Sequence, residues 1–163
     1  MRFLILIFAL NLSGSCQSLE DGWKDIRPLK TDKKTVEKIL GTPKVDSNGY
    51  HGYKIGDVFI QVNYSTEPCV GDLLNRGKYN VPKDTVLEYI VYFHEFTELS
   101  KLKFDRKKFT ESRSEHLSEV FYLASREIGV IIAAFEQQGR EYVSNIEFRP
   151  KTKDMEKVKC PKQ

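Results

Sequence analysis

Residues 30–43 constrain the fold more than any other stretch, because they carry the clearest helix signal in the chain. Thr31 can cap the first turn, and Gly41 followed by Pro43 ends the helix. The helix has one narrow apolar stripe, formed by Val36, Ile39 and Leu40. A helix of about nine residues is marginal alone. The stripe must therefore pack on the segment that follows, whose pattern is typical of strands.

Alternating apolar residues predict six strands after this helix, at 50–55, 58–64, 85–93, 119–124, 130–136 and 142–149. In the strand at 85–93 both faces are apolar, which predicts a central strand covered on both sides. We expect an α+β fold in which a short N-terminal helix packs on a mainly antiparallel sheet of about five to six strands. Residues 19–163 form a single domain in this interpretation.

Residues 1–18 have the pattern of a cleaved export signal. Arg2 supplies a positive start, residues 3–12 are almost entirely apolar, and residues 13–15 are small. A run of about ten apolar residues is shorter than the roughly 20 that a membrane-spanning helix needs. We therefore expect an exported protein, located in the periplasm, outside the cell or tethered to a membrane by a lipid.

Cys16 leaves the form of export open. It follows the apolar run at the place where bacterial lipoproteins are cut and acylated, but Ser13 stands where those proteins usually carry an aliphatic residue. Plain cleavage is the preferred interpretation, and lipidation of Cys16 is the alternative. A lipid there would tether the domain to a membrane without changing its fold.

Cys69 and Cys160 are the two cysteines of the predicted domain. An oxidising compartment favours a disulfide between them. A reactive thiol and a zinc ligand are the alternatives, although neither cysteine has a CxxC motif or a histidine at ligand spacing. The sequence therefore predicts a Cys69–Cys160 disulfide.

The charges of the chain are nearly balanced and interspersed, with 26 Lys and Arg against 23 Asp and Glu. This pattern excludes the basic footprint of a nucleic-acid-binding protein. Two features are candidate partner contacts, although a packed aromatic ring and a solvated loop are the simpler explanations. They are Trp23 and a basic loop consisting of Lys101, Lys103, Arg106, Lys107 and Lys108.

Catalytic and metal-binding motifs are missing from the sequence. His94 and His116 each adjoin a glutamate, but the chain has no HExxH motif, no Gly-x-Ser-x-Gly elbow and no phosphate-binding loop. We therefore expect no cofactor, no metal and no catalytic residues. A small metal-dependent hydrolase that uses one of these histidines is the least favoured alternative.

The helix, its Leu40-Gly41-x-Pro43 ending and the short strands that follow resemble envelope lipoprotein domains of the SmpA/OmlA type over residues 30–64. Similar units occur in secreted β-lactamase inhibitor proteins. Nearly the whole predicted domain resembles a group of uncharacterised exported bacterial proteins of similar length, although many of them have Trp at the position of Tyr79. The shared residues are Gly22-Trp23, Ile26, Pro28-Leu29, Val36 to Pro43, Pro68-Cys69, Asn80-Val81-Pro82, Asp84-Thr85-Val86-Leu87 and Cys160.

These resemblances imply an exported domain and leave its activity open. The preferred hypothesis is a non-enzymatic binding or envelope-assembly module that presents a sheet face or edge to another envelope or secreted protein. A secreted enzyme inhibitor is the alternative. The oligomeric state and the identity of the partner do not follow from the sequence.

Overall fold

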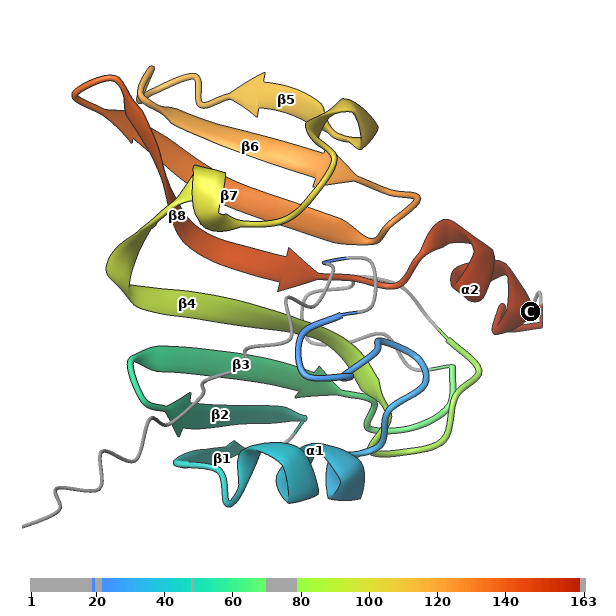
Figure 1. Cartoon of the computed structure of the whole chain (residues 1–163). Helices are drawn as coiled ribbons and strands as arrows, with labels where there is room; N and C mark the ends of the chain where they lie inside the picture. Colours follow the sequence, from blue (N-terminus) through green and yellow to red (C-terminus); the bar gives the residue numbers. More distant parts are fainter. Residues whose placement is uncertain (1–18, 20–21, 48, 70–78, 162–163) are drawn as a thin grey trace, which may run out of the picture.

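The computed structural model describes residues 19, 22–47, 49–69 and 79–161. These residues form one eight-stranded antiparallel sheet in the order β1-β2-β3-β4-β8-β7-β6-β5 (Figure 1). Two α-helices and two short 3-10 helices complete the described part: α1 (Lys33–Leu40), α2 (Thr152–Lys157), η2 (Leu99–Lys101) and η3 (Arg106–Lys108). The strands are β1 (Val45–Ser47), β2 (Tyr50–Ile55), β3 (Val58–Tyr64), β4 (Val86–Glu98), β5 (Thr110–Arg113), β6 (Val120–Ser125), β7 (Val130–Gln137) and β8 (Arg140–Phe148).

The sheet consists of two four-stranded meanders that meet at one strand pair. Strands β1 to β4 run side by side in chain order. The chain then crosses through η2 and η3 to the far edge, and β5 to β8 return toward the centre, where β8 pairs with β4 (Figure 1). The pairing of β4 with β8 is irregular between Tyr92 and Thr97, where β4 bends.

The predicted α+β class with five to six strands is wrong, because the described chain is mostly β-sheet with eight strands and little helix. The predicted strands at 50–55 and 58–64 coincide with β2 and β3. The two additional strands, β1 and β5, are short edge strands in which every residue is exposed. A strand without a buried face has no apolar alternation, so the periodicity could not reveal them.

Helix α1 is capped by a different residue from the one predicted. The side chain of Asp32 accepts a hydrogen bond from the backbone N–H of Thr35 at 2.8 Å, whereas Thr31 is buried and accepts one from the N–H of Arg27. Asp32 thus provides an acceptor for a first-turn N–H group that has no partner within the helix, which is the role of an N-cap residue. Val36 and Leu40 are the buried residues of the helix.

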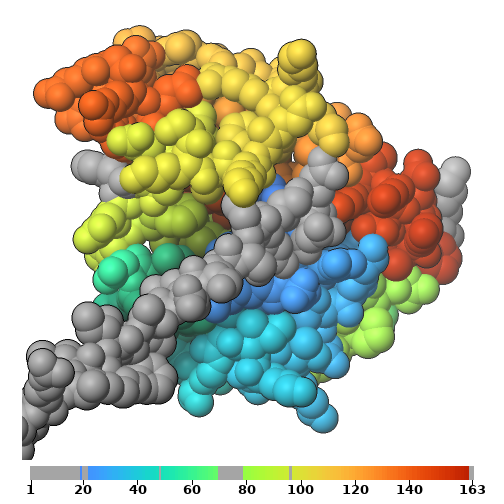
Figure 2. All heavy atoms as spheres, in the orientation of Figure 1, coloured from blue at the N-terminus to red at the C-terminus, as the bar shows by residue number. Residues whose placement is uncertain are grey.

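The main core lies on one face of the sheet. It combines residues of both meanders, including Ile60 and Tyr89 from one and Phe121 and Ile132 from the other. The segment before α1 and the segment containing η2 and η3 cover this face, and both are visible on the same side of the molecule (Figure 2). Side chains of these segments pack against the core, namely Leu19, Trp23, Leu102, Phe104 and Phe109.

Tyr89 anchors the segment before α1 to the sheet. Its hydroxyl donates to the carbonyl of Ile26 at 2.9 Å and accepts from the N–H of Trp23 at 2.7 Å. Ile26 is fully buried. This segment therefore belongs to the folded domain, and residues 22–32 contain two isolated β-bridges, Trp23 with Ile26 and Asp32 with Thr85.

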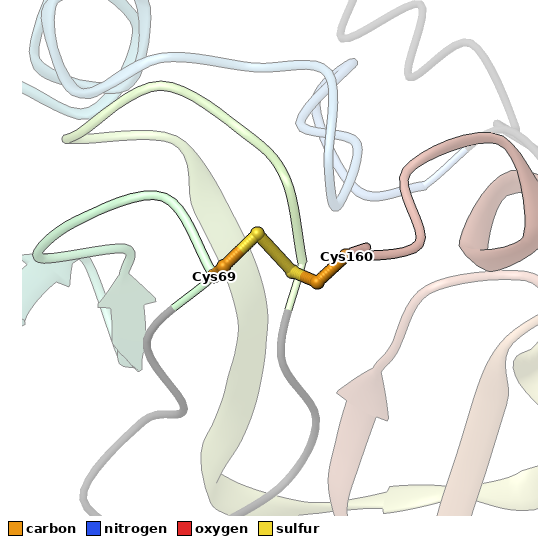
Figure 3. Close-up of a disulfide and its surroundings, with 2 residues drawn as sticks. All are labelled: Cys69 and Cys160. Carbon is orange, nitrogen blue, oxygen red and sulfur yellow. A yellow bond between two sulfur atoms is a disulfide. The ribbon is translucent and has the colours of Figure 1, made fainter. Parts of the chain in front are cut away.

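Cys69 and Cys160 form the predicted disulfide, with their Cα atoms 5.6 Å apart (Figure 3). The bond joins the chain after β3 to the chain after α2, across 91 residues of sequence. Among the described residues, none of the helices has the length and apolar character needed to cross a membrane.

Removing the disulfide by Cys69→Ala together with Cys160→Ala should lower the free energy of unfolding by roughly 4 to 5 kcal/mol, because a long loop loses its constraint in the unfolded state. Denaturant titration of the oxidised protein and the variant measures the difference. The reduced wild-type protein is the control and should match the variant. Equal stability of the oxidised protein and the variant would contradict the prediction.

Candidate functional site

The second face of the sheet is the main candidate for a binding surface. Beside the buried Asn63 and Glu88, the strand registers place a set of ten side chains there, opposite the core face, and we call these ten the open face: Phe59, Gln61, Ile90, Tyr92, Tyr122, Ala124, Ile131, Ala133, Asn145 and Glu147. Only Ala133 among them is buried, and Tyr122 is 40% exposed. The predicted cover on both sides of the strand at 85–93 is therefore wrong, since Ile90 and Tyr92 stay partly exposed.

Five of these ten residues are aliphatic or aromatic and larger than alanine, and they span both meanders. Phe59 and Tyr92 lie on neighbouring strands with their ring centroids 6.2 Å apart. Ile90 and Ile131 lie on either side of β8, in register with Glu147. Glu147 and Asn145 lie between the apolar residues of the two meanders, so the open face mixes apolar and polar side chains. Partly exposed apolar side chains gathered on one sheet face make it a candidate interaction site.

A groove of about 620 Å³ lies beside one end of the open face, between the strands and α2. Its apolar lining includes Leu87, Ile131 and Met155. Tyr79 also lines it, and its hydroxyl donates to the sulfur of Met155 at 3.3 Å. The groove is large enough to receive a bulky apolar side chain of a partner.

Two of the three charged residues that line the groove have side-chain partners within the protein, and the third, Arg126, is exposed. Glu88 is 3% exposed and accepts a hydrogen bond from the side-chain amide of Asn63 at 2.8 Å. Arg149 donates to Glu147 at 2.6 Å. Burial is the largest single influence and lowers the pKa of Arg149, but the hydrogen bond to Glu147 and the charges of Glu147, Glu88 and Tyr79 together raise the pKa above its usual value. With these charges paired, the groove favours an apolar contact.

A second cluster lies beneath α1 and centres on His51. The imidazole is 3% exposed, and its Nε2 lies 3.2 Å from a carboxylate oxygen of Asp46. Its Nδ1 is buried and has no hydrogen-bond partner in the described part of the chain. The rings of His51 and Tyr64 meet edge to face at 5.0 Å, and the hydroxyls of Tyr64 and Tyr53 are 3.0 Å apart.

The surroundings of His51 favour its neutral form. Burial lowers the pKa of His51 below its usual value of 6.5, and the positive charge of Lys33 acts in the same direction. The carboxylates of Asp46, Glu37 and Asp84 act against this change and do not outweigh it. Burial likewise raises the pKa of the Tyr64 hydroxyl, so the His51 and Tyr64 side chains are both uncharged at neutral pH.

Trp23, a candidate partner contact, is half-buried against the core. The ammonium of Lys24 lies 5.2 Å from the centre of its ring. The structure thus gives Trp23 a packing role, and contact with a partner stays a prediction. Cys16 and the predicted signal segment lie outside the described residues.

The predicted basic loop is divided by the fold. Arg106 donates to Glu141 at 2.7 Å and to Glu111 at 2.8 Å, and these bonds raise its pKa. Lys108 lines a different surface, together with lysines from the C-terminal segment. The remaining members, Lys101, Lys103 and Lys107, are exposed.

His94 and His116 are both exposed, His94 on β4 and His116 in the turn between β5 and β6. Within the described residues, no group of three or more His, Cys, Asp or Glu side chains could hold a metal ion. The residues of the hydrolase alternative are therefore not assembled into a recognisable site in this part of the chain.

The structure assembles one basic surface that the sequence did not indicate. A pocket between the segment before α1 and the segment after β8 is lined by Arg27, Lys30, Arg149, Lys151 and Lys153. More than 100 residues of sequence separate the first two from the others. The alternating basic residues at 149, 151 and 153 were the available signal, but only the fold places them beside Arg27 and Lys30.

Neither the family models nor the curated proteins include a match for this chain. Among solved structures, it is similar to a cysteine-rich secretory protein from Staphylococcus aureus, with 11% sequence identity and a TM-score of 0.35. The similarity covers 74% of this chain and 44% of that protein, so the chain spans less than half the length of its match. A TM-score this low carries no argument about fold or function.

Replacing His51 should change the pH dependence of stability. Because its pKa is lower in the folded state, the unfolded state binds a proton more readily, and stability should fall as the pH decreases from about 6.5 toward the folded pKa. In His51→Gln this part of the decrease should disappear. Denaturant titrations across this pH range measure it, and His94→Gln, at an exposed histidine, is the control. Parallel curves for wild type and His51→Gln would contradict the prediction.

Proposed function

We propose that this protein is an exported, non-enzymatic binding module whose open face contacts another protein. One observation carries the proposal: apolar side chains on β3, β4, β7 and β6 stay partly exposed on a single continuous face beside an apolar groove. Burying that face against a partner would remove apolar surface from water, which is the main driving force of association.

Two features support export. The Cys69–Cys160 disulfide is typical of proteins that fold in an oxidising compartment. Residues 1–18 have the composition of a cleaved signal. We therefore propose that the mature domain acts in the cell envelope or outside the cell. If Cys16 carries a lipid, the domain is held at a membrane.

The chemistry of the groove favours binding over catalysis. A general acid or base needs a titratable group that can reach a substrate. Glu88 is instead buried and bonded to Asn63, and Arg149 is bonded to Glu147. We therefore infer a partner that inserts an apolar side chain into the groove and lies flat across the open face. If that partner is an enzyme that loses activity, the module is an inhibitor.

A photo-crosslinking amino acid at Tyr122 should yield a discrete adduct with one protein in the native host. Leu117 provides a matched control, because it is 52% exposed but lies in the turn between β5 and β6, away from the open face. The expected result is an adduct from position 122 and none from position 117, resolved by mass and identified by peptide sequencing.

A second variant, Ile131→Glu, should abolish that adduct, because a carboxylate at this position would have to lose its water against the apolar surface of the partner. Thermal unfolding of the variant verifies that the domain stays folded. If both crosslinking positions give the same set of adducts, or if position 122 gives none, the open face is not the contact surface.

A further inference from the structure

The basic pocket between the two ends of the domain has the character of an anion-binding site. It encloses about 250 Å³, and five of its lining residues are basic: Arg27, Lys30, Arg149, Lys151 and Lys153. Asp154 is the one acidic residue in the lining. Its carboxylate is 9% exposed and lies 3.0 Å from the ammonium of Lys30, so it serves to hold that lysine in place.

A second cavity adjoins the first. It encloses about 390 Å³, shares Lys151 and Lys153 with the pocket, and adds Lys108 from η3. Its acidic lining residues are Glu127 and Glu156. We call the two cavities together the basic double pocket.

The charge of the double pocket departs from that of the whole chain. Its lining contains six basic and three acidic residues, whereas the chain has 26 and 23. Concave surfaces lined mainly by one sign of charge concentrate the electric field and attract ligands of the opposite sign. Lys30 and Arg149 are paired with Asp154 and Glu147, and their side chains are 51% and 43% exposed.

We propose that the basic double pocket binds a ligand with at least two neighbouring phosphate groups. A phosphate monoester carries about −1.5 to −2 charges at neutral pH and three acceptor oxygens, more than one carboxylate offers to several lysines and arginines. One phosphate occupies the pocket beside Arg27 and Lys30. The next lies in the second cavity near Lys108, with Lys151 and Lys153 between the two.

This proposal does not depend on the open face. Lys151 and Lys153 line both parts of the double pocket but do not line the apolar groove, so their substitution leaves the proposed protein contact intact. The phosphates could belong to a free oligophosphate or to the headgroups of a phospholipid surface. Both offer the same chemistry, and separate probes distinguish them.

Calorimetric titration with inorganic tripolyphosphate at physiological salt tests the proposal. The full mature chain should bind one equivalent, and Lys151→Gln with Lys153→Gln should weaken binding by roughly tenfold or more, because charge-assisted hydrogen bonds are lost. The matched control is Lys101→Gln with Lys103→Gln, which removes the same charge from the exposed basic loop and should leave the affinity within about twofold. Lys151→Arg with Lys153→Arg should retain binding.

Three results would overturn the proposal. If tripolyphosphate binding does not saturate, or if both pairs of Lys→Gln changes weaken it equally, the attraction comes from the overall charge of the surface and not from the double pocket. Inorganic orthophosphate that binds as tightly as tripolyphosphate would show that only one phosphate is engaged. Sedimentation with vesicles that contain an anionic phospholipid distinguishes the two sources of phosphate. If the wild-type protein sediments with the vesicles and the Lys151→Gln, Lys153→Gln variant does not, the phosphates belong to lipid headgroups. If the protein binds tripolyphosphate but does not sediment with the vesicles, they belong to a free ligand.

Discussion

The pairing of β4 with β8 is the interaction on which the rest of the structure depends. It joins two meanders that each consist of sequence neighbours, and it brings the rings of Tyr89 and Phe148 into a stack with centroids 4.5 Å apart. The Tyr89 hydroxyl then holds the segment before α1 over the core. Because β4 and β8 occupy the middle of the sheet, their outer residues also join the open face into one surface.

Two surfaces of different chemistry meet at Arg149. Its side chain lines the apolar groove on one side and the basic double pocket on the other, and Glu147 of the same strand end fixes its position. The two proposed contacts, apolar area for a protein and positive charge for an anion, therefore lie on adjoining surfaces that share this one residue.

The sequence predicted well the first hairpin of the sheet. Strands β2 and β3 follow the predicted bounds because Gly56-Asp57 marks the turn between them and apolar residues recur at every second position of β3. Strand β5 and helix α2 were missed because their residues are mostly exposed and charged, a pattern shared by loops. The open face was misjudged for a related reason: Ile90 and Tyr92 are apolar whether or not something covers them, and composition does not distinguish the two situations. The basic double pocket needs Arg27 and Lys151 side by side, which only the tertiary fold provides.

The position of the disulfide has a consequence for the order of events during biosynthesis. Cys69 precedes β4, whereas Cys160 follows every strand and α2. A chain that enters an oxidising compartment from its N-terminus therefore carries an unpaired Cys69 thiol until the whole sheet has emerged. During this interval the Cys69 thiol can form a disulfide with another protein. Formation of the Cys69–Cys160 disulfide therefore requires that both meanders have entered the compartment and paired.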